Sequence, residues 1–301
     1  MQSIFWGRRT ACRWVVQAAA LGIILGGCSV DQLMVRRLGD ALSTQGNGPE
    51  NDPQLAHEAS AFYLKLSESV LRQNPSHRQL AESVAAGFTQ YAFAYVSQEA
   101  DFIEDADPRR ANGLRQRAAR LYQRAQKHAM TALGKQTPTL WAALDSPTHN
   151  PLTVEQVGLA YWAAAAWGGW ISLSTDNPEV LADLPKATQL ARWAWERDPG
   201  FGQGSLASLM GTFEASRPGG SLAQAVTYFD QAIQISAGQS AGAYLSKAER
   251  WALPRHDRQQ FDQLIAQALA VQTPDDHPLS LANQIMQARA RWLMSNADFS
   301  F

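Results

Sequence analysis

The cysteine at position 28 stands in a context that favours covalent attachment of a lipid to its thiol. It ends the string Leu25-Gly26-Gly27-Cys28, whose small residues suit a signal peptidase, and an apolar run over residues 14–25 precedes it, with arginines at 8, 9 and 13 in front. This run is shorter than the ~20 apolar residues that a membrane-spanning helix needs. We therefore expect residues 1–27 to be an export signal and Cys28 to carry the lipid. The alternative is an uncleaved signal anchor.

Side chains that could perform catalysis or bind a metal are scattered along the chain. No two histidines have metal-ligand spacing on one helix, and none has an acidic partner arranged as in a zinc protease. The glycine-rich segment 200–204 follows a helix end at Asp198-Pro199 and not a strand, which indicates a turn and not a phosphate loop. No nucleophile, base and orienting group can be named together. The sequence predicts no enzyme, no metal site and no cofactor.

An acidic run precedes a strongly basic helix. Its acidic side chains are Glu99, Asp101, Glu104, Asp105 and Asp107, and seven basic residues follow between Arg109 and Lys127. One interpretation is a solvated antiparallel pairing, in which Asp107 caps a helix that begins at Pro108. The other is a face that docks a partner protein, where opposed charges would orient the encounter. For the second we expect Glu99, Asp101, Glu104 and Asp105 to be the docking residues.

Aromatic residues at helical spacing are the better lead to a ligand. Tyr91 and Tyr95 are four residues apart on one helix, and Tyr244, Lys247 and Trp251 share a stripe on another. Core packing alone would explain most such stripes, whereas a mainly apolar pocket with a few polar anchors would bind a small molecule, with Lys247 meeting a carboxylate. The candidate ligand residues are Tyr91, Tyr95, Trp162, Trp167, Trp170, Tyr244, Lys247 and Trp251.

The elements that must position these residues are helices. Apolar residues recur at spacings of three and four almost throughout, breaks occur at pairs such as Asn74-Pro75 and Asn177-Pro178, and no stretch is typical of a strand. Ala187, Ala191, Ala194 and Pro199 have the offsets of Ala225, Phe229, Ala232 and Ala237, with a helical glycine upstream of each set, at Gly168 and Gly211. This is the skeleton of a tetratricopeptide hairpin. We expect an all-α fold of tetratricopeptide-like hairpins stacked in an irregular array.

Composition bounds the remaining possibilities. Without residues 1–27, 274 residues remain, with 23 basic and 27 acidic side chains and a net charge of −4, so nothing favours binding to nucleic acid. Cys12 would leave with the signal and Cys28 would be acylated, so the folded body would have no free thiol. Residues 28–52 have little apolar periodicity after Leu42 and predict a flexible tether, and residues 53–301 predict the helical domain.

Several separate blocks, in order, resemble the T-component family of tripartite ATP-independent periplasmic (TRAP) transporters. The similarity covers roughly Pro53 to Phe301, and its blocks are Tyr91–Val96, the acidic run, Tyr161–Gly168 with Ile171-Ser172, Asp198-Pro199, Ala248–Pro254 and Arg289–Leu293. The resemblance implies a lipid-anchored helical protein that works beside a periplasmic solute-binding protein feeding a permease. It also implies an apolar ligand passage, completed by self-association into a homo-oligomer. Ser29 after the cysteine resembles lipoproteins that are sorted to the outer membrane and face the periplasm.

We therefore expect an accessory component that docks a solute-binding protein and shelters a hydrophobic or amphipathic carboxylate. The alternative is an outer-membrane scaffold for envelope assembly that binds peptides on a concave surface and has no small ligand.

Overall fold

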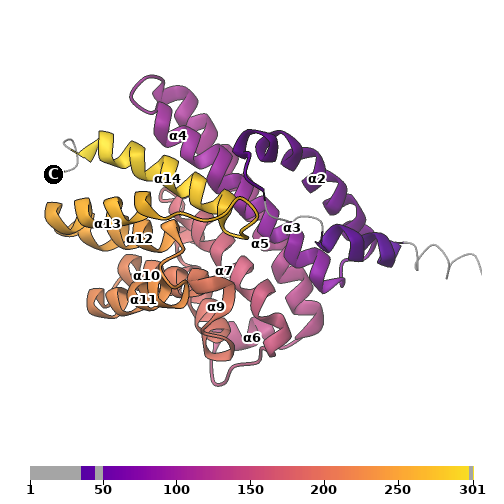
Figure 1. Cartoon of the computed structure of the whole chain (residues 1–301). Coiled ribbons are helices and arrows are strands. Elements are labelled where there is room, and N and C mark those ends of the chain that lie inside the picture. Colours follow the sequence, from indigo (N-terminus) through magenta and orange to yellow (C-terminus); the bar gives the residue numbers. More distant parts are fainter. Residues whose placement is uncertain (1–34, 45–49, 298–300) are drawn as a thin grey trace, which may run out of the picture.

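The computed structural model describes residues 35–44, 50–297 and 301. The predicted export signal (1–27) and lipid attachment site (Cys28) lie outside the described residues. Within the described ranges the chain forms helices joined by turns, with no strand (Figure 1). The all-α prediction is confirmed. None of the described helices has both the length and the apolar composition that crossing a membrane requires.

The helices follow one another closely along the chain. In order they are α2 (Pro53–Gln73), α3 (Arg78–Tyr91), the π-helix η1 (Ala92–Ser97), α4 (Gln98–Ile103), α5 (Pro108–Gln136), α6 (Leu140–Asp145), η2 (Val154–Gln156), α7 (Val157–Ser172), α8 (Pro178–Leu181), α9 (Leu184–Arg197), η3 (Phe201–Gly204), α10 (Ser205–Ser216), α11 (Leu222–Ile235), α12 (Ala241–Lys247), the π-helix η4 (Ala248–Ala252), η5 (Leu253–Arg255), α13 (Arg258–Ala270) and α14 (Ser280–Ser295).

Acidic or amide residues before prolines start three of these helices. Asp107 accepts a hydrogen bond from the amide of Arg110 at 3.0 Å, and Pro108 is the first residue of α5, as the sequence predicts. Asp52 before Pro53 and Asn177 before Pro178 act in the same way. Each carboxylate or amide oxygen satisfies an amide that the helix leaves unpaired, and proline has no amide to lose at that position.

The predicted repeat corresponds to two consecutive hairpins. Ala187, Ala191 and Ala194 are fully buried on α9, and Phe229 is fully buried on α11. The preceding helices, α7 and α10, pack against α9 and α11 respectively. A Cβ atom added at Gly211 would lie 2.6 Å from Cε1 of Phe229, so the close approach of α10 to α11 depends on that glycine.

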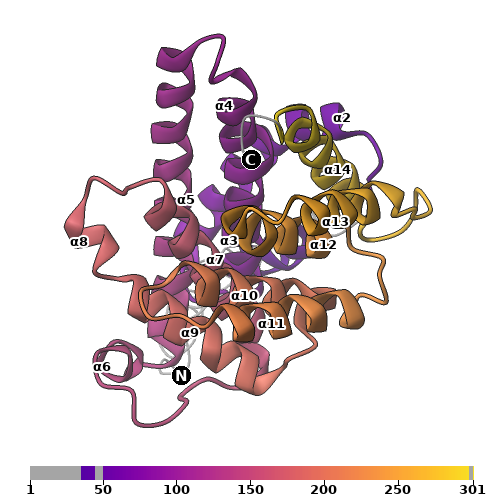
Figure 2. The ribbon, with the colours of Figure 1, turned by 90° about the vertical axis from the view of Figure 1, so that its left-hand side faces the viewer.

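The buried apolar side chains form two main groups. The N-terminal core runs from Leu42 to Phe213, and the C-terminal core runs from Ala241 to Ala297. A small alanine group, Ala207, Ala232 and Ala243, lies where α10, α11 and α12 meet. Helices α12, α13 and α14 lie side by side, and α14 returns to contact α2 (Figures 1 and 2). The last hairpin therefore bridges the two ends of the array.

Part of the range expected to be a flexible tether is helical. Residues 35–44 form a helix in which Leu42 is 4 % exposed. The Tyr63 hydroxyl of α2 donates to the carbonyl of Leu42, and Asp40 Oδ1 lies 3.0 Å from Nε2 of His77. Leu42 is the last periodic apolar residue before the glycine-rich stretch. Its side chain joins the N-terminal core, and this burial holds the segment against the body. The boundaries at residues 27 and 52 remain predictions.

Candidate functional site

The structure places the eight candidate ligand residues in separate groups. Tyr91 and Tyr95 lie together at the junction of α3 and η1. The tryptophans of α7 pack within and around the N-terminal core, and Tyr244, Lys247 and Trp251 lie beside the C-terminal core.

The tyrosine cluster consists of His57, Tyr91, Tyr95 and Arg117. The rings of His57 and Tyr95 stack at 4.5 Å between centroids, and Tyr91 meets the Tyr95 ring edge-on at 5.6 Å. The Tyr91 hydroxyl lies 3.4 Å from both His57 Nε2 and Arg117 Nη2. Burial raises the pKa of Tyr95, with a further contribution from Glu50. The cluster therefore combines aromatic faces with an exposed guanidinium.

The tryptophans of α7 have different surroundings. Trp167 is 1 % exposed and meets Trp141 of α6 edge-on at 6.1 Å. Trp162 packs edge-on against Tyr161 at 4.8 Å, and burial raises the pKa of Tyr161 to about 12. Trp170 is half-buried against the N-terminal core. Trp167 thus fills the core, whereas Trp162 and Trp170 keep part of their surface exposed, and their role in ligand binding stays a prediction.

The stripe of Tyr244, Lys247 and Trp251 spans the end of α12 and the π-helix η4. Lys247 Nζ lies 2.5 Å from Asp230 Oδ1 of α11 and 5.2 Å from the centroid of the Trp251 ring. Its ammonium group thus already has a carboxylate and an aromatic face within the protein. Tyr244 and Trp251 are half-buried against the C-terminal core.

The candidate docking residues lie on the hairpin of α4 and α5, which projects at one end of the molecule (Figure 2). Glu99 forms an ion pair with Arg110, and Arg115 forms ion pairs with Asp101 at 3.1 Å and with Glu104. Asp105 is exposed at the turn. The solvated antiparallel pairing expected as one of the two interpretations is therefore present within the hairpin.

Arg289 joins this hairpin to the C-terminal helices. Its Nη1 atom lies 2.9 Å from Asp101 Oδ2, and its Nη2 atom lies 2.7 Å from Glu249 Oε1. Burial alone would lower the pKa of Arg289, but Glu249 and Asp101 outweigh this and raise it. We call Arg289, Asp101 and Glu249 the arginine bridge. Charge-assisted bonds of this kind are the stronger hydrogen bonds in proteins.

Both carboxylates of the arginine bridge adjoin a π-helix. Asp101 follows η1 on the same continuous helix, and Glu249 lies within η4. Short π-helical turns frequently occur at functional sites. Reasoning from sequence missed Arg289 and Glu249 as site residues, although each lies in a block that carries the family resemblance. Their presence in these family blocks, beside the block that holds Asp101, was the signal in the sequence that could have identified them.

A second network missed from sequence surrounds Glu68, whose side chain is 1 % exposed. Burial raises the pKa of this carboxyl group, but hydrogen bonds from Arg124, Lys65 and His128 outweigh burial and hold the pKa well below its usual value. Burial also lowers the pKa of His128, despite its hydrogen bond to Glu68. This network joins α2 to α5, so these charged side chains have a role in holding the two helices together.

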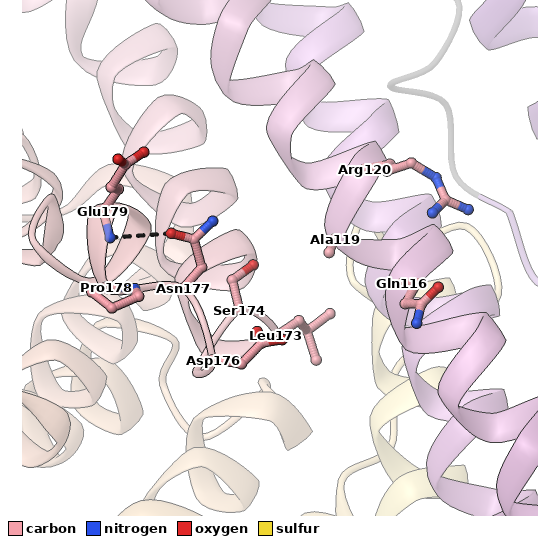
Figure 3. A pocket seen from close by; sticks show the side chains of 9 residues that line it. All are labelled: Gln116, Ala119, Arg120, Leu173, Ser174, Asp176, Asn177, Pro178 and Glu179. Atoms are coloured by element: carbon pink, nitrogen blue, oxygen red, sulfur yellow. Dashed lines mark hydrogen bonds between the residues drawn. The ribbon is translucent and has the colours of Figure 1, made fainter.

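A surface hollow of about 810 Å³ lies between α5 and the loop after α7. Figure 3 shows Gln116, Ala119 and Arg120 on one wall and the segment from Leu173 to Glu179 on the other. The hollow is open and largely polar, and none of the candidate ligand residues lines it. Among the described residues, no cluster of histidine, cysteine and acidic side chains could hold a metal ion.

Comparison with known proteins identifies the family. The model of the TRAP transporter T-component family matches residues 49–301. A protein of Treponema pallidum (strain Nichols), described as uncharacterized, is 24 % identical over 274 residues, which cover 88 % of this chain and 85 % of the relative. The expected resemblance is therefore confirmed. The chain belongs to the T-component family of TRAP transporters and is an accessory, envelope-associated component of TRAP transport.

Proposed function

We propose that the protein is a lipid-anchored accessory component, held at the outer membrane through Cys28 and facing the periplasm. There it docks a TRAP-type solute-binding protein and shelters a hydrophobic or amphipathic carboxylate, as a homo-oligomer and without catalysis. The family match supports the transport role. The tyrosine cluster is the observation that carries the ligand proposal.

The tyrosine cluster has the composition that an amphipathic carboxylate requires. His57 and Tyr95 are half-buried and offer aromatic surface for an apolar chain, and the buried Tyr91 packs edge-on against Tyr95. Arg117 is exposed, with its guanidinium carbon 5.7 Å from the centroid of the Tyr91 ring, and its contact with the Tyr91 hydroxyl is long. A planar guanidinium pairs well with a carboxylate. Lys247, in contrast, is engaged by Asp230. Arg117 therefore suits the ligand head group better.

The α4–α5 hairpin supports the docking proposal. It projects from the body, and its turn exposes Asp105 beside Phe102, which is 41 % exposed. Glu99, Asp101 and Glu104 hold the basic side chains of α5 in place beneath this tip. An exposed charge beside an exposed aromatic side chain is a suitable composition for a transient protein contact.

Native mass spectrometry of the gently purified protein tests the ligand proposal. We expect an extra mass typical of a lipid-like carboxylate, which is lost in Tyr95→Ala and Arg117→Gln. The matched controls are Tyr228→Ala, which removes a half-buried tyrosine of another aromatic pair, and Arg120→Gln, one turn along α5. Retention of the mass in the test variants, or its loss in the controls, contradicts the assigned site. An empty protein that binds peptides would favour the scaffold alternative.

Binding to a TRAP solute-binding protein of the same organism tests the docking proposal. We expect Asp105→Lys to weaken the complex severalfold and to change its dependence on salt, because an exposed interface charge acts mainly through screened electrostatics. Asp276→Lys changes the same charge in an exposed loop after α13 and should leave the affinity unchanged. Equal affinities for the two variants would remove the α4–α5 hairpin as the docking surface.

A further inference from the structure

Helix α2 has a second apolar face that no described part of the chain covers. Leu55, Ala59, Phe62 and Leu66 recur at intervals of four, three and four residues and form one stripe. Phe62 is 76 % exposed, the highest value among the large apolar side chains in the described ranges, and Leu55 is 54 % exposed. The opposite face of α2, with Leu64 and Leu71, is buried. Burial in the fold therefore does not explain this stripe.

The position of Cys28 limits how far this stripe lies from a membrane. Cys28 precedes Val35, the first described residue, by seven residues, which span at most about 25 Å even when fully extended. A body of this size has a diameter of about 46 Å. An acyl chain on Cys28 therefore cannot reach a bilayer that lies beyond the far side of the body. The bilayer must therefore lie within about 25 Å of Val35, on the side of the molecule that carries residues 35–44.

That end of the molecule carries the α2 stripe. The Tyr63 hydroxyl contacts the carbonyl of Leu42, so the segment that leads to Cys28 lies beside the middle of α2. Phe62 directly precedes Tyr63 in the chain. The same two helices expose the basic side chains Arg36, Arg37, Lys65 and Arg72, of which Lys65 and Arg72 form ion pairs with the buried Glu68. They also expose two acidic side chains, Asp40 and Glu58, so basic side chains are in excess. Exposed apolar side chains beside basic residues are the composition of a helix that lies on an anionic phospholipid surface.

We propose that the outer face of α2, formed by Leu55, Phe62 and Leu66, rests on the phospholipid surface into which the Cys28 lipid inserts. The inference relies on the proposed lipid anchor and adds a second, non-covalent contact. That contact fixes the orientation of the body. Helix α2 faces the membrane, and α11, which lies well apart from α2 in both views, is farther from it (Figures 1 and 2).

The absence of free thiols in the acylated protein allows a site-specific test. Phe62→Cys and, as the matched control, Leu222→Cys at the exposed start of α11 each introduce a single reactive thiol, and both native side chains are exposed. The acylated full-length variants are spin-labelled on vesicles of phosphatidylethanolamine and phosphatidylglycerol. Mass spectrometry of the Cys28 peptide confirms acylation, and circular dichroism confirms the fold.

We expect the label at 62 to lose collisions with a water-soluble nickel complex severalfold relative to the label at 222, and to gain collisions with oxygen, which concentrates in lipid. Leu66→Cys should behave like Phe62→Cys. Equal aqueous accessibility at 62 and 222 overturns the proposal while leaving the lipid anchor intact. Strong dipolar coupling between labels at 62 on two copies also overturns it, in favour of self-association. A Cys28 peptide without acyl mass overturns both the contact and the anchor.

Discussion

The N-terminal and C-terminal cores differ in how they are built. The N-terminal core is continuous from Leu42 to Phe213 and contains large buried side chains such as Trp167. The C-terminal core is smaller, and small alanines form much of its junction with α10 and α11. Each alanine buries little apolar surface. Polar and aromatic contacts add to this junction: the arginine bridge, the ion pair of Lys247 with Asp230 and the contact of Phe102 with Trp292. Because its core is smaller, we expect the C-terminal part to open locally at lower free energy than the rest.

Removal of a large buried side chain from each core gives the strongest test of whether the C-terminal part opens separately from the rest. Trp167 and Phe261 are both 1 % exposed, and truncation of such a residue to alanine costs about 3–5 kcal/mol. We expect Trp167→Ala to increase amide hydrogen exchange throughout the chain, and Phe261→Ala to increase it mainly within residues 241–297. A uniform increase in both variants would mean that the two cores unfold as one unit.

Loss of the arginine bridge should have the next largest effect. Arg289→Met leaves Glu249 without its arginine while Asp101 keeps Arg115, so we expect a loss of about 2–3 kcal/mol, below the range for a fully buried pair. Hydrogen exchange should rise in α12–α14 before it rises elsewhere. Arg250→Met, which removes an exposed arginine on the same π-helix, is the control. Equal effects in the two variants would show that the bridge does not hold the cores together.

Two glycines differ in the space around them, Gly211 lying against a neighbouring helix and Gly113 facing open space. Gly211→Ala places a methyl group against the ring of Phe229, between the two cores, and should lower the free energy of unfolding by about 1–3 kcal/mol. Gly113→Ala meets nothing within 4 Å and should raise it by about 0.5–1 kcal/mol, because alanine favours a helix. Urea denaturation measures both. Stabilisation by Gly211→Ala would mean that the α10–α11 contact is looser than described.

Mild acid should produce the smallest effect, and only in the N-terminal core. The pKa of His128 is lowered from its ordinary value of 6.5, so the unfolded chain binds a proton more readily and stability declines as the pH falls below 6.5. The pKa of Glu68 is also lowered, so its contribution declines only below about 4.5. His128→Gln should flatten thermal stability between pH 6.5 and 5. An unchanged pH profile would exclude His128 as the titrating group.

Local features of the chain could be predicted from sequence because they depend on neighbouring residues. Asp107 before Pro108 defines the start of α5, and the alanine spacing defines the face that α9 buries. The pairing of the acidic run with the basic helix also follows from a short turn between them. Each of these is a contact within one helix or one hairpin.

The arginine bridge and the π-helices could not be predicted in this way. Arg289 and Asp101 are 188 residues apart, so their contact depends on the path of the whole array. The separation of the candidate aromatic residues has the same origin. Helical periodicity shows which side chains share a face of one helix, but it does not show which helices lie together. Trp167 of α7 packs in the N-terminal core, whereas Trp251 of η4 packs against the C-terminal core. The tyrosine cluster was partly predictable, since Tyr91 and Tyr95 are four residues apart, whereas His57 and Arg117 join it from other helices.

The π-helix η1 lets the chain carry one additional residue before Asp101 without turning that side chain away from Arg289. A π-turn holds one more residue than an α-turn, so the segment Ala92–Ser97 takes up the additional residue within about one turn, and the helix beyond it keeps its phase. Deletion of a single residue within Ala92–Ser97 would therefore restore an ordinary helix and leave Asp101 facing Arg289. This segment thus tolerates the gain or loss of one residue, and a change in chain length here would leave the contact between the two cores in place.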